Sequence, residues 1–159
     1  MRSRGIWPLM KHRLMRTAVV DAPINATTLI AEVSRNANGA ALLFIGTVRE
    51  VNDGRAVSGI EYQAYRPMAE RELADIAAEA QQQFGAEDIV VEHRLGPLEL
   101  GDTSVAIAVA HAHRGAAYAA SRYVIEQIKH RVPIWKLEYY ADGSREWVNT
   151  ASAASAEAQ

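Results

Sequence analysis

Residues 104–140 read SVAIAVAHAHRGAAYAASRYVIEQIKHRVPIWKLEYY, and this stretch decides the fold. Its first part, 104–111, is a nearly uninterrupted apolar run, which is typical of a buried strand. Small and apolar side chains then recur at helical spacing over 114–130, and Pro133 ends that helix. Residues 134–140 follow as another strand. The stretch therefore predicts a long helix between two strands.

Toward the N-terminus, the pattern predicts further strands and a second long helix. The strands are expected over 40–48, 57–65 and 88–94, and the helix begins at Pro67 and is closed by Gly85. The continuous apolar character of 40–48 predicts a strand covered on both faces. This order predicts the α+β class, with a mixed sheet and two main helices.

Shorter features connect these elements. A helix over 29–36, capped by Asn25 or Thr27, is expected after the first apolar run. Residues 50–55 are predicted to form a turn or mobile loop, and Gly96-Pro97 a turn.

The composition is that of one globular domain. The chain has 159 residues, of which 49% are hydrophobic and 23% charged, which argues against a disordered chain. Its longest apolar stretch is far too short to cross a bilayer. A formal charge of −2 gives no overall electrostatic basis for binding nucleic acid. We therefore expect a cytoplasmic protein with no membrane or nucleic-acid partner, in which any anion site is local.

The two ends and the cysteine count add three expectations. Residues 1–16 are basic and lack the apolar region of a secretory signal, so we expect a flexible N-terminal extension. The domain is predicted over 17–149 and a disordered tail over 150–159. The chain has no cysteine, which excludes disulfides, thiolate metal sites and a cysteine nucleophile.

The first candidate site is His111-Ala112-His113-Arg114-Gly115, where a strand meets the start of a long helix. Free N–H groups at a helix N-terminus, together with an adjacent Arg and His, suit a phosphate or carboxylate. Two alternatives stay open. The imidazoles can satisfy backbone groups in a polar connection, or His111 and His113 can bind a metal, although no third ligand is evident.

Arg49 is the second candidate, because it follows a buried strand and its guanidinium suits phosphate or carboxylate.

The third candidate is the pair Lys129 and Lys136, which flank an apolar Pro-Ile-Trp segment. A lysine held against apolar groups or other cations has its charged form disfavoured and can act as a nucleophile or proton carrier. Each also has a structural interpretation. Lys129, in the last turn of a helix, can complement the helix dipole, Lys136 can face solvent on a strand, and Arg49 can be a solvated charge at a strand end.

Glu61, Tyr62 and Tyr65 form a fourth cluster. These side chains can line a pocket, but tyrosines that alternate along a strand more often pack across strands.

Several segments in order resemble the large, catalytic subunit of molybdopterin synthase, the MoaE family. They are GAALLFIGTVRE (39–50), IEYQAYRPMAERELADIA (60–77), HRLGPLELGD (93–102), AHAHRGAAYAASRYVIEQIKHRVPIWKLE (110–138) and DGSREWV (142–148). The most specific parts are FIGTVR, AHRG and K-x-x-x-P-x-W-K. Leu137 departs from the pattern, since relatives often have another basic residue there.

The resemblance implies an α/β-hammerhead fold and a sulfurtransferase that binds neither a metal nor a cofactor. It implies a homodimer that binds a small ubiquitin-like sulfur carrier at each far end, giving a heterotetramer. The carrier's C-terminal Gly-Gly thiocarboxylate would enter this subunit's pocket and convert cyclic pyranopterin monophosphate into the dithiolene molybdopterin.

Residue by residue, the resemblance implies catalytic roles for Lys129 and Lys136. Arg49, His113 and Arg114 match the substrate's anion pocket, to which the dimer mate can contribute. Because the chain has no thiol, such an enzyme needs an external sulfur donor. Two other functions stay open: a non-catalytic module that binds a pterin, a phosphate or the carrier, and a metal-dependent hydrolase that uses His111 and His113.

Overall fold

The structure is a computed structural model that describes residues 13–148. Its elements in chain order are β1 (Met15–Val20), α1 (Ala26–Val33), β2 (Ala40–Thr47), β3 (Val51–Asn52), β4 (Arg55–Ala64), α2 (Arg66–Phe84), β5 (Asp88–Arg94), β6 (Gly96–Glu99), β7 (Thr103–His111), α3 (Arg114–Arg131), β8 (Ile134–Tyr140) and β9 (Arg145–Val148). Among these described residues, no helix is long and apolar enough to span a membrane.

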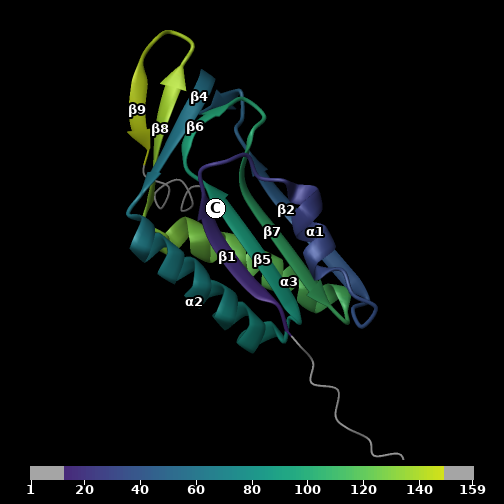
Figure 1. The fold of residues 1–159 in the computed structure, drawn as a ribbon. Coiled ribbons are helices and arrows are strands. Elements are labelled where there is room, and N and C mark those ends of the chain that lie inside the picture. The colour runs from purple at the N-terminus through teal and green to yellow at the C-terminus, as the bar shows by residue number, and fades with distance from the viewer. Residues whose placement is uncertain (1–12, 149–159) are drawn as a thin grey trace, which may run out of the picture.

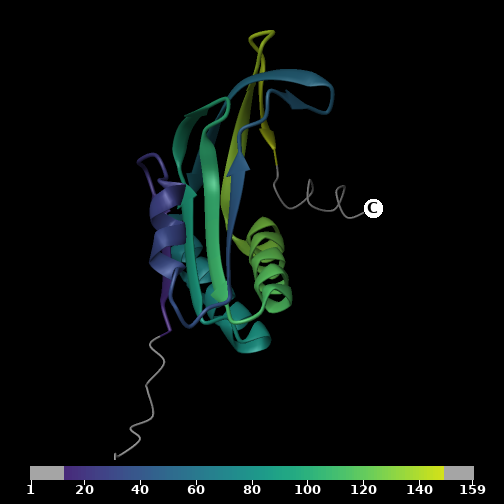
Figure 2. The same cartoon turned by 90° about the vertical axis from the view of Figure 1, so that its right-hand side faces the viewer.

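The first sheet has the strand order β1-β5-β7-β2. β1 runs parallel to β5, whereas β5 and β2 both pair with β7 in antiparallel fashion. Helix α1 covers one face of this sheet, while α2 and α3 cover the other (Figures 1 and 2). The larger apolar core lies between the sheet and the two long helices, and a smaller core, which includes Leu29 and Val90, lies under α1.

The second sheet stands at one end of the molecule, beyond the ends of the helices (Figure 1). It runs β3-β4-β8-β9, and β6 pairs with β4. The turn predicted at Gly96-Pro97 is therefore wrong, because both residues belong to β6 and pair with Tyr62 and Glu61. β4 and β8 form the centre of this sheet, and the register sets Lys136 opposite Tyr62.

The predicted α+β class with two main helices is confirmed by α2 and α3. The strands predicted over 88–94 and 134–140 match β5 and β8. The short helix begins at Ala26, earlier than predicted, because Asn25 caps it by accepting a hydrogen bond from the Thr28 N–H.

The predicted start of the domain, at residue 17, falls inside β1, which begins at Met15. Residues 1–12 of the predicted extension and the whole predicted tail, 150–159, lie outside the described residues.

β2 differs from its prediction in one respect. Helices α1 and α3 both contact it, so both faces are partly covered as expected. However, β2 is the last strand of its sheet, and no strand among residues 13–148 pairs with its outer edge. Phe44 and Ile45 are consequently 37% and 41% exposed, which leaves an apolar edge.

Candidate functional site

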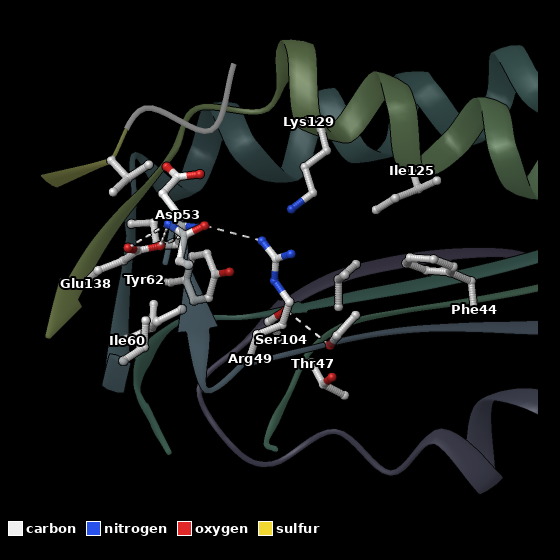
Figure 3. Close-up of a pocket in the computed structure, with 16 residues that line it drawn as sticks. Phe44, Thr47, Arg49, Asp53, Ile60, Tyr62, Ser104, Ile125, Lys129 and Glu138 are labelled. Atoms are coloured by element: carbon white, nitrogen blue, oxygen red, sulfur yellow. Dashed lines mark hydrogen bonds and ion pairs between the residues drawn. The ribbon is translucent and has the colours of Figure 1, made fainter. Parts of the chain in front are cut away.

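A cavity of about 610 Å³ lies where the end of β2, the last turns of α3 and the second sheet meet (Figure 3). One part of its lining is apolar and comes from Phe44, Val57, Ile60, Tyr62, Val105, Ile125 and Val148. The other part is charged or polar and comes from Thr47, Arg49, Asn52, Asp53, Ser104, Lys129, Lys136 and Glu138. Three cations thus face two carboxylates beside an apolar wall.

The cavity brings together Arg49, Lys129 and Lys136, which come from three separate segments. Arg49 follows β2, Lys129 lies in the last turn of α3, and Lys136 lies on β8. In Figure 3, Lys129 points from its helix into the cavity toward Arg49. Three of the five predicted site residues therefore share one pocket, as a local site for anions requires.

The last turn of α3 carries Lys129, His130 and Arg131 in succession. Consecutive residues on a helix point about 100° apart, so their side chains reach three different surroundings. Lys129 lines the cavity, His130 is exposed, and Arg131 lies against α2. Only Lys129 is thus available to the pocket, although the helix dipole favours all three cations.

Arg131 joins the two long helices. Its guanidinium donates to both carboxylate oxygens of Glu79, at 2.6 and 3.0 Å, and forms an ion pair with Glu72 at 3.2 Å. The Tyr123 hydroxyl donates to the same Glu79 carboxylate at 2.6 Å. Hydrogen bonds from Arg131 and then Tyr123 lower the pKa of Glu79 to about 2.

We expect Arg131→Met to lower the free energy of unfolding by about 1 kcal/mol near neutral pH, a value reduced for the partial exposure of Glu79. Because the folded-state pKa of Glu79 is depressed, this stabilisation is present above about pH 4.5 and is lost as the pH falls toward 2. Urea unfolding at several pH values measures it. Arg122→Met, which removes an exposed pair with Glu126 in the same helix, is the control and should leave the midpoint unchanged. Equal midpoints for both variants near neutral pH would contradict the assignment.

Lys136 is held by a buried carboxylate. Its Nζ lies 3.0 Å from Glu138 Oε1, and the Glu138 side chain is 1% exposed. Tyr140 donates its hydroxyl to Glu138 Oε2 at 2.7 Å, and the Asn52 amide donates to both oxygens. Burial raises the pKa of Glu138, but the bonds from Tyr140, Asn52 and Lys136 outweigh it, so this pKa is lowered. The hydrogen bond to Glu138 raises the pKa of Tyr140 to about 12.

The sequence analysis missed Asn52 and Glu138. Glu138 lies two residues after Lys136 on the same strand, so alternation sets both on one face, and this signal could have found it. Asn52 lies in a segment that the sequence predicts only as a turn or loop. It forms the end of a tight hairpin, in which Asp53 and Gly54 both have positive φ and Asn52 pairs with Arg55.

His113 and Arg114 lie outside the cavity. They stand at the start of α3, and Lys129 lies near its end, about 22 Å further along the helix axis. Ala40, which pairs with His111, begins the same strand that Arg49 follows, about 30 Å away along β2. Both His113 and Arg114 are exposed, and His111 Nδ1 accepts a hydrogen bond from the His113 N–H at 2.8 Å.

A metal site at the histidines finds no support among residues 13–148, where no group of three or more His, Cys, Asp or Glu is arranged to hold a metal.

The structure separates the three residues of the fourth cluster, Glu61, Tyr62 and Tyr65. Tyr62 lines the cavity, Tyr65 is 58% exposed, and Glu61 accepts a hydrogen bond from Tyr139. Glu61 and Tyr65 therefore do not share the pocket.

His93 is a buried titratable group beside the cavity wall. Its ring meets the edge of Tyr62 at a centroid distance of 5.2 Å, and its Nδ1 lies 3.0 Å from the Arg94 carbonyl oxygen. Burial, and to a lesser degree the charge of Lys129, lower the pKa of His93 to about 4. His93 is therefore neutral at physiological pH, and the cations of the site remain those of Arg49 and the two lysines.

Comparisons with known proteins point in one direction. A family model described as MoaE protein matches residues 19–131. The molybdopterin synthase catalytic subunit of Bacillus subtilis is 43% identical over 133 residues, which cover 84% of this chain and 84% of that protein. Its counterpart in Synechococcus elongatus is 52% identical over 111 residues, which cover 69% of this chain and 67% of that protein.

Solved structures agree. A molybdopterin synthase structure from Staphylococcus aureus superposes with a TM-score of 0.76 at 40% identity and covers 82% of this chain and 94% of that one. This match confirms the fold class that the resemblance implied. A complex of subunits 1 and 2 of the molybdopterin-converting factor from Helicobacter pylori matches with a TM-score of 0.68, and at 20% identity it shows the fold alone.

Proposed function

The chain belongs to the MoaE family, and from this premise we propose that it acts as the catalytic subunit of a molybdopterin synthase, a sulfurtransferase of molybdenum cofactor biosynthesis. The observation that carries this function is the cavity in which Arg49, Lys129 and Lys136 converge. In this proposal the cavity receives two anionic groups: the phosphate of cyclic pyranopterin monophosphate, and the thiocarboxylate tail of a small ubiquitin-like carrier. An external sulfur donor is required because the chain has no cysteine to hold sulfur, and in this proposal the carrier is that donor.

The lining of the cavity supports this substrate class. The apolar wall, which includes Phe44 and Ile125, offers a surface for a flat heterocycle, while the guanidinium of Arg49 suits a phosphate. Lys136 is already paired with Glu138 at 3.0 Å, so its charge is balanced before any anion enters. With three cations and two carboxylates in its lining, the cavity has an excess of positive charge for an anion.

We assign different roles to the two lysines. Lys129 is the acid–base or nucleophilic group, because it projects from the last turn of α3 into the cavity toward Arg49, and a second cation nearby disfavours the charged form of a lysine. Lys136 assists by stabilising negative charge that develops on the reacting groups, from a position fixed by Glu138.

Reconstitution tests the proposed function. The purified chain is mixed with thiocarboxylated carrier and cyclic pyranopterin monophosphate, and product is detected as the oxidised, fluorescent derivative of molybdopterin. We expect product only when all three components are present. Carrier binding without product would instead support a non-catalytic docking module.

His113 and Arg114 require a second copy of the chain to reach this site. The unpaired apolar edge of β2 is the surface we propose for that contact. Antiparallel pairing of β2 with β2 of the partner about a two-fold axis would extend the sheet across both copies. If the axis passes near the middle of β2, Ala40 of the partner subunit lies opposite Thr47.

This pairing supplies the missing residues. Ala40 lies beside His111 in the sheet, and α3 begins shortly after that position, on the same face of the sheet as the cavity. The partner's His113 and Arg114 would therefore approach the end of β2 that carries Arg49. The start of one α3 would face the end of the other, which adds the positive end of a helix dipole to the anion pocket.

We expect Ile45→Lys to convert a dimer into a monomer and to remove most turnover, because pairing would bury the new charge against apolar side chains of the partner. Light scattering coupled to size exclusion measures the mass. Met15→Lys, at a 42% exposed position on the opposite edge of the same sheet, is the matched control and should remain dimeric. A dimeric, fully active Ile45→Lys protein would rule out the β2 interface.

A further inference from the structure

Asn52 connects the two halves of the pocket through a single amide. Its Nδ2 donates to Glu138 Oε1 at 3.0 Å and to Oε2 at 2.9 Å. Its Oδ1 accepts from the Arg49 guanidinium at 3.4 Å. Dashed lines in Figure 3 follow this connection between Arg49 and Glu138. Asn52 therefore joins an anion-binding cation on one side to the carboxylate that holds Lys136 on the other.

Only a side chain that both donates and accepts fits this position. An aspartate would still accept from Arg49, but it would set a second carboxylate against Glu138, whose side chain is 1% exposed. An aliphatic side chain would donate no hydrogen bond, so the buried Glu138 carboxylate would keep only Lys136 and Tyr140 as partners. The Asn52 amide thus suits both neighbours, because its oxygen accepts from the Arg49 cation and its NH₂ group donates to the Glu138 anion.

The backbone holds this amide in place. Asn52 is the last residue of β3, and the tight turn at Asp53 and Gly54 pairs it with Arg55 at the start of β4. Arg55 in turn lies over the Tyr140 ring, 3.5 Å from its centroid, and forms an ion pair with Glu146. Arg55, which is paired with Asn52, therefore attaches the hairpin to β8 and β9.

We propose that Asn52 is a positioning residue for sulfur transfer, which sets the separation of Arg49 and Lys136 by holding the Glu138 carboxylate between them. This inference rests on the proposed function and assigns Asn52 no contact with the reacting atoms. Loss of the bridge lets Lys136 and Glu138 move relative to Arg49, so binding of the substrate survives while the geometry of the chemical step is lost.

The test is a donor–acceptor exchange across the bridge. Asn52→Asp is expected to lower kcat at least about tenfold and to change KM for the pterin less than about threefold. Adding Glu138→Gln places an amide donor at position 138 opposite the new carboxylate at position 52, so the total charge equals that of the parental pair. This double variant should recover at least about half of the lost kcat on a logarithmic scale. Asn52→Ala, which adds no charge, is a second single variant with the same expected direction and keeps the test independent of the stability of Asn52→Asp.

Three results would overturn the inference. Parental kcat in the Asn52 variants would show that the bridge does not matter, and a double variant no more active than Asn52→Asp would show that Asn52 does not act through Glu138. A loss confined to KM would indicate direct contact with substrate. The parental chain, assayed in the same mixture, separates the two proposals: no product from it contradicts the proposed function together with this inference, whereas the other results contradict this inference alone.

Discussion

Lys129→Ala is expected to lower kcat for dithiolene formation by about a thousandfold, the usual size of an acid–base contribution. Lys129 lines the cavity from the last turn of α3, and the neighbouring cations of that turn point elsewhere. The alanine variant should still bind the carrier, because the change removes one side chain inside the pocket. Reconstitution gives the turnover, and a pull-down with the carrier checks that binding survives.

Two further variants make this prediction specific. Lys129→Arg keeps the positive charge but replaces an amine with a guanidinium that does not release its proton, so we expect it to remain inactive. His130→Ala removes the exposed neighbour in the same helical turn and should keep parental turnover. Substantial activity in Lys129→Arg would show that Lys129 supplies charge alone, and near-normal activity in Lys129→Ala would remove it from the chemistry.

Two impaired variants, Lys129→Ala and Arg114→Ala, are expected to form one intact pocket when their chains share a dimer. Arg114→Ala should lower kcat/KM by about tenfold to a hundredfold, because a guanidinium–phosphate contact is lost. In the proposed dimer, Lys129 acts in the pocket of its own chain, whereas Arg114 acts in the pocket of the partner. A mixed dimer of the Lys129→Ala and Arg114→Ala chains would therefore contain one pocket with both defects and one intact pocket.

Random pairing makes half of the dimers mixed, and one of the two pockets in each mixed dimer is intact. About one quarter of all pockets are then intact, so about one quarter of the parental activity should be recovered. Co-expression of the two chains followed by reconstitution measures it. Lys129→Ala combined with Lys136→Ala is the control. Both lysines line the same chain's cavity, so neither pocket of that mixed dimer is intact and no activity should return. If the first pair also stays inactive, the pocket is not shared between copies.

Local sequence patterns predicted much of the fold. The strands over 88–94 and 134–140 and the long helix that begins at Arg114 were predicted within a residue or two, because apolar runs, helical periodicity and Pro133 act over a few neighbours. The pairing of Gly96 with Tyr62 was not predicted. A Gly-Pro pair is a local turn signal, and its place in a strand depends on a partner far along the chain.

Some residues of the candidate site were likewise predicted from the sequence, and others were not. Residue type and the family resemblance pointed to Arg49, Lys129 and Lys136, and the structure brings these three together. The cavity also holds Asn52 and Glu138, whose contacts join residues 86 positions apart. A contact of that kind leaves no periodic trace, although alternation along β8 could have indicated Glu138.

By itself, the sequence determined the kinds of element, the cations available for an anion pocket and the absence of a thiol, since these follow from residue type and short-range spacing. Only the tertiary structure decided that β2 is the last strand of its sheet among residues 13–148, that Lys129 and Arg131 lie in different surroundings, and that His113 and Arg49 lie at opposite ends of β2. The physical reason is that sheet order and helix packing depend on hydrogen bonds and apolar contacts between distant segments, and these set which side chains meet.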